Sequence, residues 1–244
     1  MGKISQVSIM RKIIKAILFD IDDTLYDRNL AQSMILERIV KKLPHVFQSL
    51  PMDRIVKAFF ESDRITVNAF NAGAPSEGLR DTRSRHFLRL LGIKEDIAES
   101  ITDMYVREYP HINAPVDGAV TLVMESRRRF KVGAVSNGFP DVQYRKLETL
   151  GLRDAFTCIV LSEEIGIRKP DPRIFRKAAG LLGVPPSACL YVGDSYNSDI
   201  VGAKAAGMTT CWLCRDEVFP ENPQVHTDYV VCSLEKLQRI IGRL

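Results

Sequence analysis

The sequence of 244 residues lacks the features that mark membrane, secreted and repetitive proteins. It has no apolar run near the ~18–20 residues of a membrane-spanning helix, so we expect no membrane span. Its first residues, MGKISQVSIMRK, lack the long apolar segment of a signal peptide. It also contains no internal repeat and no low-complexity tract. We therefore expect a globular protein of the cytoplasm.

Cysteine is scarce as well, and its five residues, an odd number, do not indicate a disulfide framework. Cys211 and Cys214 form a Cys-x-x-Cys pair, which could be a redox pair or half of a zinc site. No second such pair exists, and the four histidines are scattered. Positions three apart in a strand face opposite sides, so we interpret both thiols as packing residues.

Neither sign of charge dominates, because 34 Lys and Arg residues stand against 30 Asp and Glu residues, a net charge of +4. This balance does not favour binding to a nucleic acid polymer. The one basic run, RRRFK at 127–131, ends a predicted helix, where cations complement the helix dipole. The hydrophobic fraction of 45% is ordinary for a globular protein with a sizeable core.

Short apolar runs alternate with helical stretches along most of the chain. The runs typical of buried parallel strands lie at 15–20, 131–138, 157–163, 188–194, 209–214 and 228–233. Helices are predicted at 117–129, 140–150, 172–183, 198–206 and 234–242. This alternation predicts an α/β fold with a Rossmann-like, doubly wound parallel sheet.

The segment 29–111 interrupts the alternation, because it contains about four predicted helices and no convincing strand. A connection of this length after the first strand predicts a second domain, a mainly α-helical cap that could close over the strand ends. We therefore predict a core domain formed by residues 1–28 and 112–244, and a cap domain formed by residues 29–111.

Carboxylates gather where predicted strands end. Asp20 ends the first strand, and Asp22 and Thr24 follow at alternating positions, so the three side chains can converge. Asp194 ends a later strand, and Asp199 follows it by five residues. Ligands of open α/β sheets bind at this edge. Clustered carboxylates need a compensating charge, and Mg²⁺, a hard cation that prefers oxygen ligands, is the natural one.

Two further segments indicate a phosphoryl group at the same edge. Ser136 and Asn137 end the second predicted strand, and Gly138 allows a tight turn after them. A hydroxyl and a following backbone N–H suit a phosphoryl oxygen. Lys169 precedes a proline in a loop that opens a helix. A lysine at this edge would neutralise both phosphate and carboxylate charge.

The segments DIDDT, VSNG, RKPDP and GDSYNSD together resemble the four motifs of the haloacid dehalogenase-like hydrolase superfamily, in the family's order. They span residues 20–199, and the α/β pattern extends the similarity to nearly the whole chain. The helical insert between the first two motifs resembles the members that carry a helical cap after the first strand. The resemblance implies a phosphatase that acts on a small phosphate ester.

The resemblance also implies the role of each motif residue. Asp20 would be the nucleophile that forms an aspartyl-phosphate, and Asp22 would be the general acid and then the general base. Lys169 would stabilise the charge of Asp20 and of the transferring group. The phosphoryl group would be bound by Thr24, Ser136, Asn137 and Lys169.

The implied metal is Mg²⁺, held by Asp20, by the backbone carbonyl of Asp22 and by Asp194. Asp199 would support the site by holding either Lys169 or a metal-bound water, and the sequence leaves both open. Asp23 and Asp27 are not needed for this chemistry, so we interpret them as turn and surface residues.

Three other functions stay open at this stage. The dehalogenases of the family lack an acid at the position of Asp22, because a halide needs no proton, so the sequence favours a phosphatase. A phosphomutase of the hexose-phosphate type would use the same acid and a similar cap. A non-catalytic binding module could keep the fold, although every motif residue is present here.

The sequence does not identify the substrate. Side chains of the cap would select it. Sugar phosphates, glyceraldehyde 3-phosphate, phosphoglycolate and nucleoside monophosphates all stay open. Arg80, Arg83 and Arg85 lie on one predicted cap helix and could meet an anionic group, although solvation at the surface is their ordinary role. A monomer and a homodimer are both compatible with the sequence.

Overall fold

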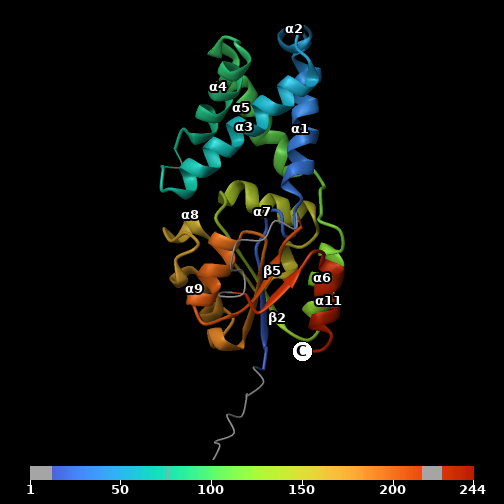
Figure 1. The fold of residues 1–244 in the computed structure, drawn as a ribbon, viewed down its shortest axis with the longest axis vertical. Helices are drawn as coiled ribbons and strands as arrows, with labels where there is room; N and C mark the ends of the chain where they lie inside the picture. Colours follow the sequence, from blue (N-terminus) through green and yellow to red (C-terminus); the bar gives the residue numbers. More distant parts are fainter. Residues whose placement is uncertain (1–12, 76, 216–226) are drawn as a thin grey trace, which may run out of the picture. The chain divides into compact units, whose positions relative to one another are not determined.

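The structure, a computed structural model, describes residues 13–75, 77–215 and 227–244 (Figure 1). Within these residues six strands form one parallel sheet in the order β3-β2-β1-β4-β5-β6. The strands are β1 (Ala16–Phe19), β2 (Lys131–Ser136), β3 (Cys158–Leu161), β4 (Cys189–Gly193), β5 (Thr209–Leu213) and β6 (Tyr229–Val231). The predicted α/β fold with a Rossmann-like parallel sheet is confirmed.

Helices cover both faces of this sheet, which explains why its strands are apolar throughout. Figure 1 shows α9 on one side and α6 with α11 on the other. The helices packed against the sheet are α6 (Ala119–Ser126), α8 (Ser162–Ile165), α9 (Pro172–Leu181), α10 (Val201–Ala205) and α11 (Leu234–Ile241). Leu18, Val135 and Tyr191 of the sheet pack with Ile174 and Phe175 of α9 in one buried cluster.

The chain divides into two compact units. The first comprises Met1–Thr24, Asp117–Asn137 and Asp154–Leu244 and contains the sheet; the second comprises Leu25–Val116 and Gly138–Arg153. Helix α7 (Pro140–Thr149) is thus grouped with the helical unit. The domain boundaries that we expect from the sequence stay a prediction. Among the described residues, no helix combines the length and the apolar character needed to cross a membrane.

The helical unit contains the four helices predicted for the insert. They are α1 (Arg28–Lys42), α3 (Met52–Asn71), α4 (Leu79–Leu91) and α5 (Ala98–Glu108), with a short α2 (Pro44–Phe47). Aromatic rings fill the space among them: Phe59 lies 5.4 Å from Phe87 and 6.2 Å from Tyr105, measured between ring centroids. Each such buried ring contributes about 1.5–3 kcal/mol through burial of apolar surface.

A pair of extended segments begins and ends the insert. Tyr26 and Pro115 form an antiparallel bridge, and the Asp27 N–H donates to the Ala114 carbonyl at 2.8 Å. The Asp27 carboxylate also caps α1 by accepting from the Leu30 N–H at 2.9 Å. Asp27 therefore has a structural role, as its position outside the motif residues indicates.

Residues 44–47 form the short helix α2, because Pro44 sits at its first position, where the missing N–H costs nothing. One predicted helix differs in the structure. The helix predicted at 198–206 is instead a π-helical turn (Tyr196–Ile200) followed by α10. Such turns are rare and occur often at functional sites, and this one carries Asp199.

Candidate active site

The predicted site residues come together at the carboxyl ends of β1, β2 and β4. Asp20 follows β1, and its N–H donates to the Val192 carbonyl of the neighbouring strand at 2.9 Å. Ser136 is the last residue of β2 and is buried. Asp194 follows β4, which pairs directly with β1. The strand order thus gives the sheet edge that the sequence predicts for ligand binding.

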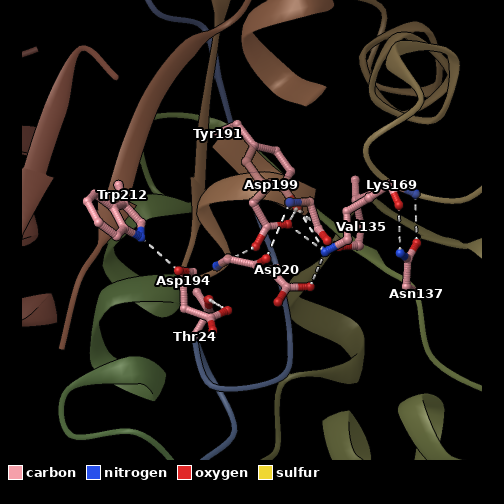
Figure 2. Close-up of polar contacts among 11 residues, drawn as sticks. Asp20, Thr24, Val135, Asn137, Lys169, Tyr191, Asp194, Asp199 and Trp212 are labelled. Atoms are coloured by element: carbon pink, nitrogen blue, oxygen red, sulfur yellow. Dashed lines mark hydrogen bonds and ion pairs between the residues drawn. The ribbon is translucent and has the colours of Figure 1, made fainter. Parts of the chain in front are cut away.

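Lys169 links two of the carboxylates (Figure 2). Its Nζ lies 2.6 Å from Oδ1 of Asp20 and 2.6 Å from Oδ1 of Asp199. All three side chains are buried, so water screens these ion pairs little. The sequence leaves two partners open for Asp199, namely Lys169 and a metal-bound water. The structure places Lys169 beside it.

Asp199 is held by Tyr191, which lies outside the four motifs, and by the backbone of its own motif. The Tyr191 hydroxyl donates to Asp199 Oδ1 at 3.0 Å, and the Ser195 N–H donates to Oδ2 at 3.0 Å. A Cβ on Gly193 would lie only 2.5 Å from Cγ of Asp199, so the close approach requires glycine there. Both carboxylate oxygens of Asp199 thus have hydrogen-bond donors.

Asp194 is positioned by two contacts. The Thr24 hydroxyl donates to Asp194 Oδ1 at 3.3 Å, and the Trp212 indole N–H donates to the Asp194 carbonyl at 2.7 Å (Figure 2). Trp212 lies between Cys211 and Cys214, so the CWLC segment supports the site through its tryptophan. Both cysteines are buried, and burial raises the pKa of Cys211 to about 12, contrary to an activated thiol.

Asn137 holds the backbone of Lys169 with both ends of its side-chain amide. Its Nδ2 donates to the Lys169 carbonyl at 3.0 Å, and its Oδ1 accepts from the Lys169 N–H at 2.8 Å. This contact fixes the loop that carries the lysine. Gly202 allows α10 to pack closely against this loop, because a Cβ there would lie 2.6 Å from the Pro170 carbonyl. The small residues of α10 thus allow this helix to lie close to the loop.

The charges at this edge do not balance. Asp20, Asp194 and Asp199 lie close together, the cation of Lys169 pairs with Asp20 and Asp199, and Asp22 lies half-buried nearby. Burial raises the pKa of Asp20 from 3.8 to about 7, and Asp199 and Asp22 add to the rise while Lys169 opposes it. Burial, followed by the charges of Asp20 and Asp199, raises the pKa of Asp194 well above its ordinary value.

Lys169 stays protonated in this setting. Burial alone would lower its pKa, but the charges of Asp199 and Asp20 outweigh burial and raise the pKa above the usual value. The lysine can therefore offset one carboxylate at neutral pH. The remaining negative charge is offset either by protonation of Asp20 or Asp194, whose pKa values burial raises, or by a bound cation.

The acidic cluster fits a divalent metal ion. One carboxylate oxygen from each of Asp20, Asp194 and Asp199 lies within 4.8 Å of the others. Because Asp199 already accepts from three donors, Asp20 and Asp194 are the carboxylates best able to bind the ion. Oxygen donors of this kind suit Mg²⁺.

The arginines of α4 are engaged within the helical unit. Arg80 pairs with Asp141 at 2.7 Å, and Arg85 pairs with Asp81 at 2.6 Å. Arg83 is buried: its guanidinium carbon lies 3.5 Å from the centre of the Tyr105 ring. Asp63, also buried, pairs with Arg83 at 3.5 Å. The sequence predicts a solvated surface position for Arg83, and this prediction is wrong. Arg83 is part of the core of this unit.

Comparison with known proteins identifies the family. The family model described as haloacid dehalogenase-like hydrolase matches residues 14–207, so the chain belongs to this family. The resemblance of the four motifs is thereby confirmed.

Two curated relatives are phosphatases by name. The chain is 30% identical over 241 residues to a glyceraldehyde 3-phosphate phosphatase of Methanopyrus kandleri, with 95% of this chain and 99% of the relative covered. It is 31% identical over 230 residues to the pyrimidine 5'-nucleotidase YjjG of Escherichia coli, with 92% and 96% covered. The predicted enzyme class, a hydrolase of the phosphatase type, is confirmed.

A solved structure of similar fold is the putative HAD-hydrolase YfnB from Bacillus subtilis, which was determined with magnesium bound. It superposes with a TM-score of 0.79 at 26% identity and covers 95% of this chain and 100% of its own. The fold class, including a helical cap, therefore agrees with that of a solved member of the family.

Proposed function

We propose that this protein is a Mg²⁺-dependent phosphatase that hydrolyses a small phosphate monoester through an aspartyl-phosphate on Asp20. The observation that carries the proposal is the buried Asp20 carboxylate, paired with Lys169 at 2.6 Å beside two further carboxylates. A nucleophile of this kind needs its charge stabilised and water limited, and both conditions hold at this strand end. The names of the two relatives support the reaction class.

In the first half of the reaction, an oxygen of Asp20 attacks the phosphorus atom of the substrate. The bond between phosphorus and the ester oxygen breaks, and Asp22 donates its proton to the leaving oxygen. The leaving group departs as a neutral alcohol, and the phosphoryl group remains on Asp20. The proposed contacts of the phosphoryl oxygens are the side chains of Thr24, Ser136 and Lys169 and the backbone N–H of Asn137.

In the second half, Asp22 accepts a proton from water, and the water oxygen attacks phosphorus. The bond between phosphorus and Asp20 breaks, inorganic phosphate leaves, and the Asp20 carboxylate is restored. One residue thus serves as acid and then as base, which returns the site to its starting state. Lys169, held by Asp199 and Asn137, keeps its ammonium beside Asp20 throughout.

Asp20, Asp194 and the backbone carbonyl of Asp22 are the proposed ligands of Mg²⁺. When bound, the ion neutralises the acidic cluster and the charge of the phosphoryl group. Asp199 is proposed to position Lys169. The site is proposed to act in the cytoplasm on a phosphorylated metabolite.

The direct test is phosphate release from a panel of phosphorylated metabolites, with Mg²⁺ and with excess chelator, beside the Asp20→Asn variant. Release that requires both Mg²⁺ and Asp20 is the expected result. Release that persists in the variant or with chelator would contradict the proposal. Transfer of the phosphoryl group to another hydroxyl of the substrate, without free phosphate, would indicate a phosphomutase instead.

A further inference from the structure

The side chain of Asn137 joins two parts of the proposed active site that are distant in the sequence (Figure 2). Its Nδ2 donates to the Lys169 carbonyl at 3.0 Å, and its Oδ1 accepts from the Lys169 N–H at 2.8 Å. Both residues belong to the compact unit that contains the sheet. One amide thus pairs with both backbone polar groups of a single residue, 32 positions further along the chain.

The other end of Lys169 is held as well. Its Nζ lies 2.6 Å from Oδ1 of Asp20 and 2.6 Å from Oδ1 of Asp199, and it also lies 3.4 Å from the Tyr191 hydroxyl. Between its main chain and its ammonium, a lysine has a flexible stem of four carbons. Holding both ends removes most of this freedom, which a charge that acts beside a reacting oxygen requires.

The loop that carries Lys169 has a second support at the next residue. Pro170 lies against α10, where a Cβ on Gly202 would be only 2.6 Å from the Pro170 carbonyl oxygen. This steric contact limits the movement of the loop towards α10, but it does not orient the Lys169 peptide groups. The two hydrogen bonds of the Asn137 amide orient them. Loss of the amide would therefore let the Lys169 main chain turn while the loop stays in place.

The backbone and the side chain of Asn137 can be assigned different tasks. The proposed contact of a phosphoryl oxygen is the backbone N–H, which every residue except proline supplies. The side-chain amide instead uses Oδ1 and a hydrogen of Nδ2 on the Lys169 backbone. Truncation of the side chain removes the contact with Lys169 and keeps the N–H. The two tasks can therefore be separated by substitution at this one position.

We propose that the Asn137 side chain is a positioning group for Lys169 and not a ligand of the phosphoryl group. It holds the lysine main chain so that the ammonium stays beside Asp20 while the phosphoryl group is transferred. Because the same residue offers its N–H to the phosphoryl group, one turn at the end of β2 places both the phosphate and the lysine. This inference rests on the proposed phosphatase function.

The test is a double-mutant cycle of Asn137→Ala and Lys169→Met in the Mg²⁺-loaded protein. In the otherwise wild-type protein, Asn137→Ala should lower kcat for p-nitrophenyl phosphate about 10–10²-fold, because a small misplacement of a catalytic group has effects of this size. Binding of inorganic phosphate, measured by calorimetry, gives the second readout. In the Lys169→Met protein, Asn137→Ala should change the Kd of phosphate by less than about twofold, because its effect passes through the lysine.

Lys131→Met is the matched control. Lys131 begins β2, and its Nζ donates to the carbonyl of Leu182, the residue that ends α9, at 2.7 Å. This variant also removes a bond from β2 to a loop backbone, so it should lower the Tm by a similar amount while kcat stays that of the wild type. Asn137→Ser, whose hydroxyl is too short to reach both backbone groups of Lys169, replaces Asn137→Ala should the alanine variant not fold, with the same expected results.

An unchanged kcat in Asn137→Ala would overturn the inference. So would phosphate binding that weakens more than about fivefold when Asn137→Ala is added to Lys169→Met, because the amide would then bind phosphate directly. Both outcomes leave the phosphatase itself intact, because the wild type still releases phosphate. Absence of release by the wild type, from p-nitrophenyl phosphate and from the panel of metabolites, would instead overturn the phosphatase function, and this inference with it.

Discussion

The ammonium of Lys169 lies 2.6 Å from a carboxylate oxygen of Asp20, although 149 residues separate the two in the sequence. The contact forms because β1 and the loop after α8 end at the same edge of the sheet, where Asn137 holds the lysine backbone. A buried carboxylate with a dedicated cation is prepared to attack an electrophile that carries negative charge, such as a phosphoryl group.

Replacing Asp20 by Asn should lower kcat at least about 10³-fold, because the amide cannot attack phosphorus. The loss should not come from unfolding, since the substitution conserves volume. Phosphate release measures the effect, and circular dichroism with a thermal melt provides the control. A variant that keeps most of its turnover would exclude Asp20 as the nucleophile.

Replacing Asp22 by Asn should affect substrates according to their leaving groups. An alkyl phosphate needs a proton on its leaving oxygen, so its turnover should fall about 10²–10⁴-fold. The first step with p-nitrophenyl phosphate needs little protonation and should be affected less. Comparison of burst and steady-state rates for the two esters measures this difference. Equal losses in the burst would argue against Asp22 as the general acid.

Binding of Mg²⁺ should weaken as the pH decreases below neutrality. The metal binds ionised carboxylates, and burial raises the pKa of Asp20 to about 7 in its absence, so protons compete with the ion. The dissociation constant should rise up to about tenfold for each pH unit below 7. Calorimetric titration at several pH values measures it. A constant that does not change between pH 8 and pH 6 would contradict the proton competition.

The same carboxylates should make the stability of the metal-free protein depend on pH. A raised pKa contributes stability below the unfolded value of 3.8, and this contribution is lost as the pH rises through about 7. At one fixed Mg²⁺ concentration, 100-fold above the Kd at pH 8, the ion should therefore raise the Tm by about 5–10 °C at pH 8 and by less at pH 5.5. A larger increase in Tm at pH 5.5 than at pH 8 would contradict the raised pKa of these carboxylates.

Trp212 and Tyr191 should act on different parts of the site. Trp212→Phe removes the donor to the Asp194 carbonyl and should weaken Mg²⁺ binding about tenfold. Tyr191→Phe removes a donor to Asp199 and should lower kcat while leaving Mg²⁺ affinity nearly unchanged. Each variant is the control for the other, since both replace a buried polar ring by phenylalanine. Indistinguishable effects would mean that both act through stability alone.

Asp63 should be a main source of stability in the helical unit. Burial alone would raise its pKa, but Arg28 and Arg83 outweigh burial and hold the pKa below the usual range. Asp63→Asn leaves the buried Arg83 without its carboxylate partner, which should cost about 3–5 kcal/mol and lower the Tm by about 10 °C. Asp81→Asn, at an exposed pair, should lower it by no more than about 2 °C.

The contribution of Asp63 to stability depends on pH with the opposite sign to that of Asp20. A lowered pKa contributes stability above the unfolded value of 3.8 and loses it as the pH falls through the folded value. The difference in Tm between the wild type and Asp63→Asn should therefore be full at pH 7 and shrink below pH 4. A difference that is unchanged at pH 3 would exclude the ion pairs as its source.

The sequence predicts those parts of the site that depend on local pattern. Asp20, Ser136 and Asp194 could be placed at one sheet edge because each ends an apolar strand-like run, and parallel strands end together. The helical insert could be predicted because it contains several amphipathic stretches and no strand. These features need no knowledge of how distant segments align.

Tyr191 and Trp212 could not be predicted, because their contacts depend on register between strands. Trp212 lies opposite Gly193 in the β4–β5 pair, which brings its indole to the Asp194 carbonyl. A one-residue shift would turn it to the other face. The available signal was chemical: a tyrosine or tryptophan in a buried strand needs a polar partner for its hydroxyl or N–H.

The central claim is a covalent phosphoryl group on Asp20, and chemical trapping tests it most directly. The Mg²⁺-loaded protein is quenched during turnover, reduced with borohydride, which converts an acyl phosphate to the alcohol, and analysed by peptide mass spectrometry. We predict homoserine at position 20, dependent on both substrate and Mg²⁺, with Asp22 and Asp194 unchanged. Reduction at another carboxylate, or an unmodified Asp20 in a protein trapped during rapid turnover, would contradict the account.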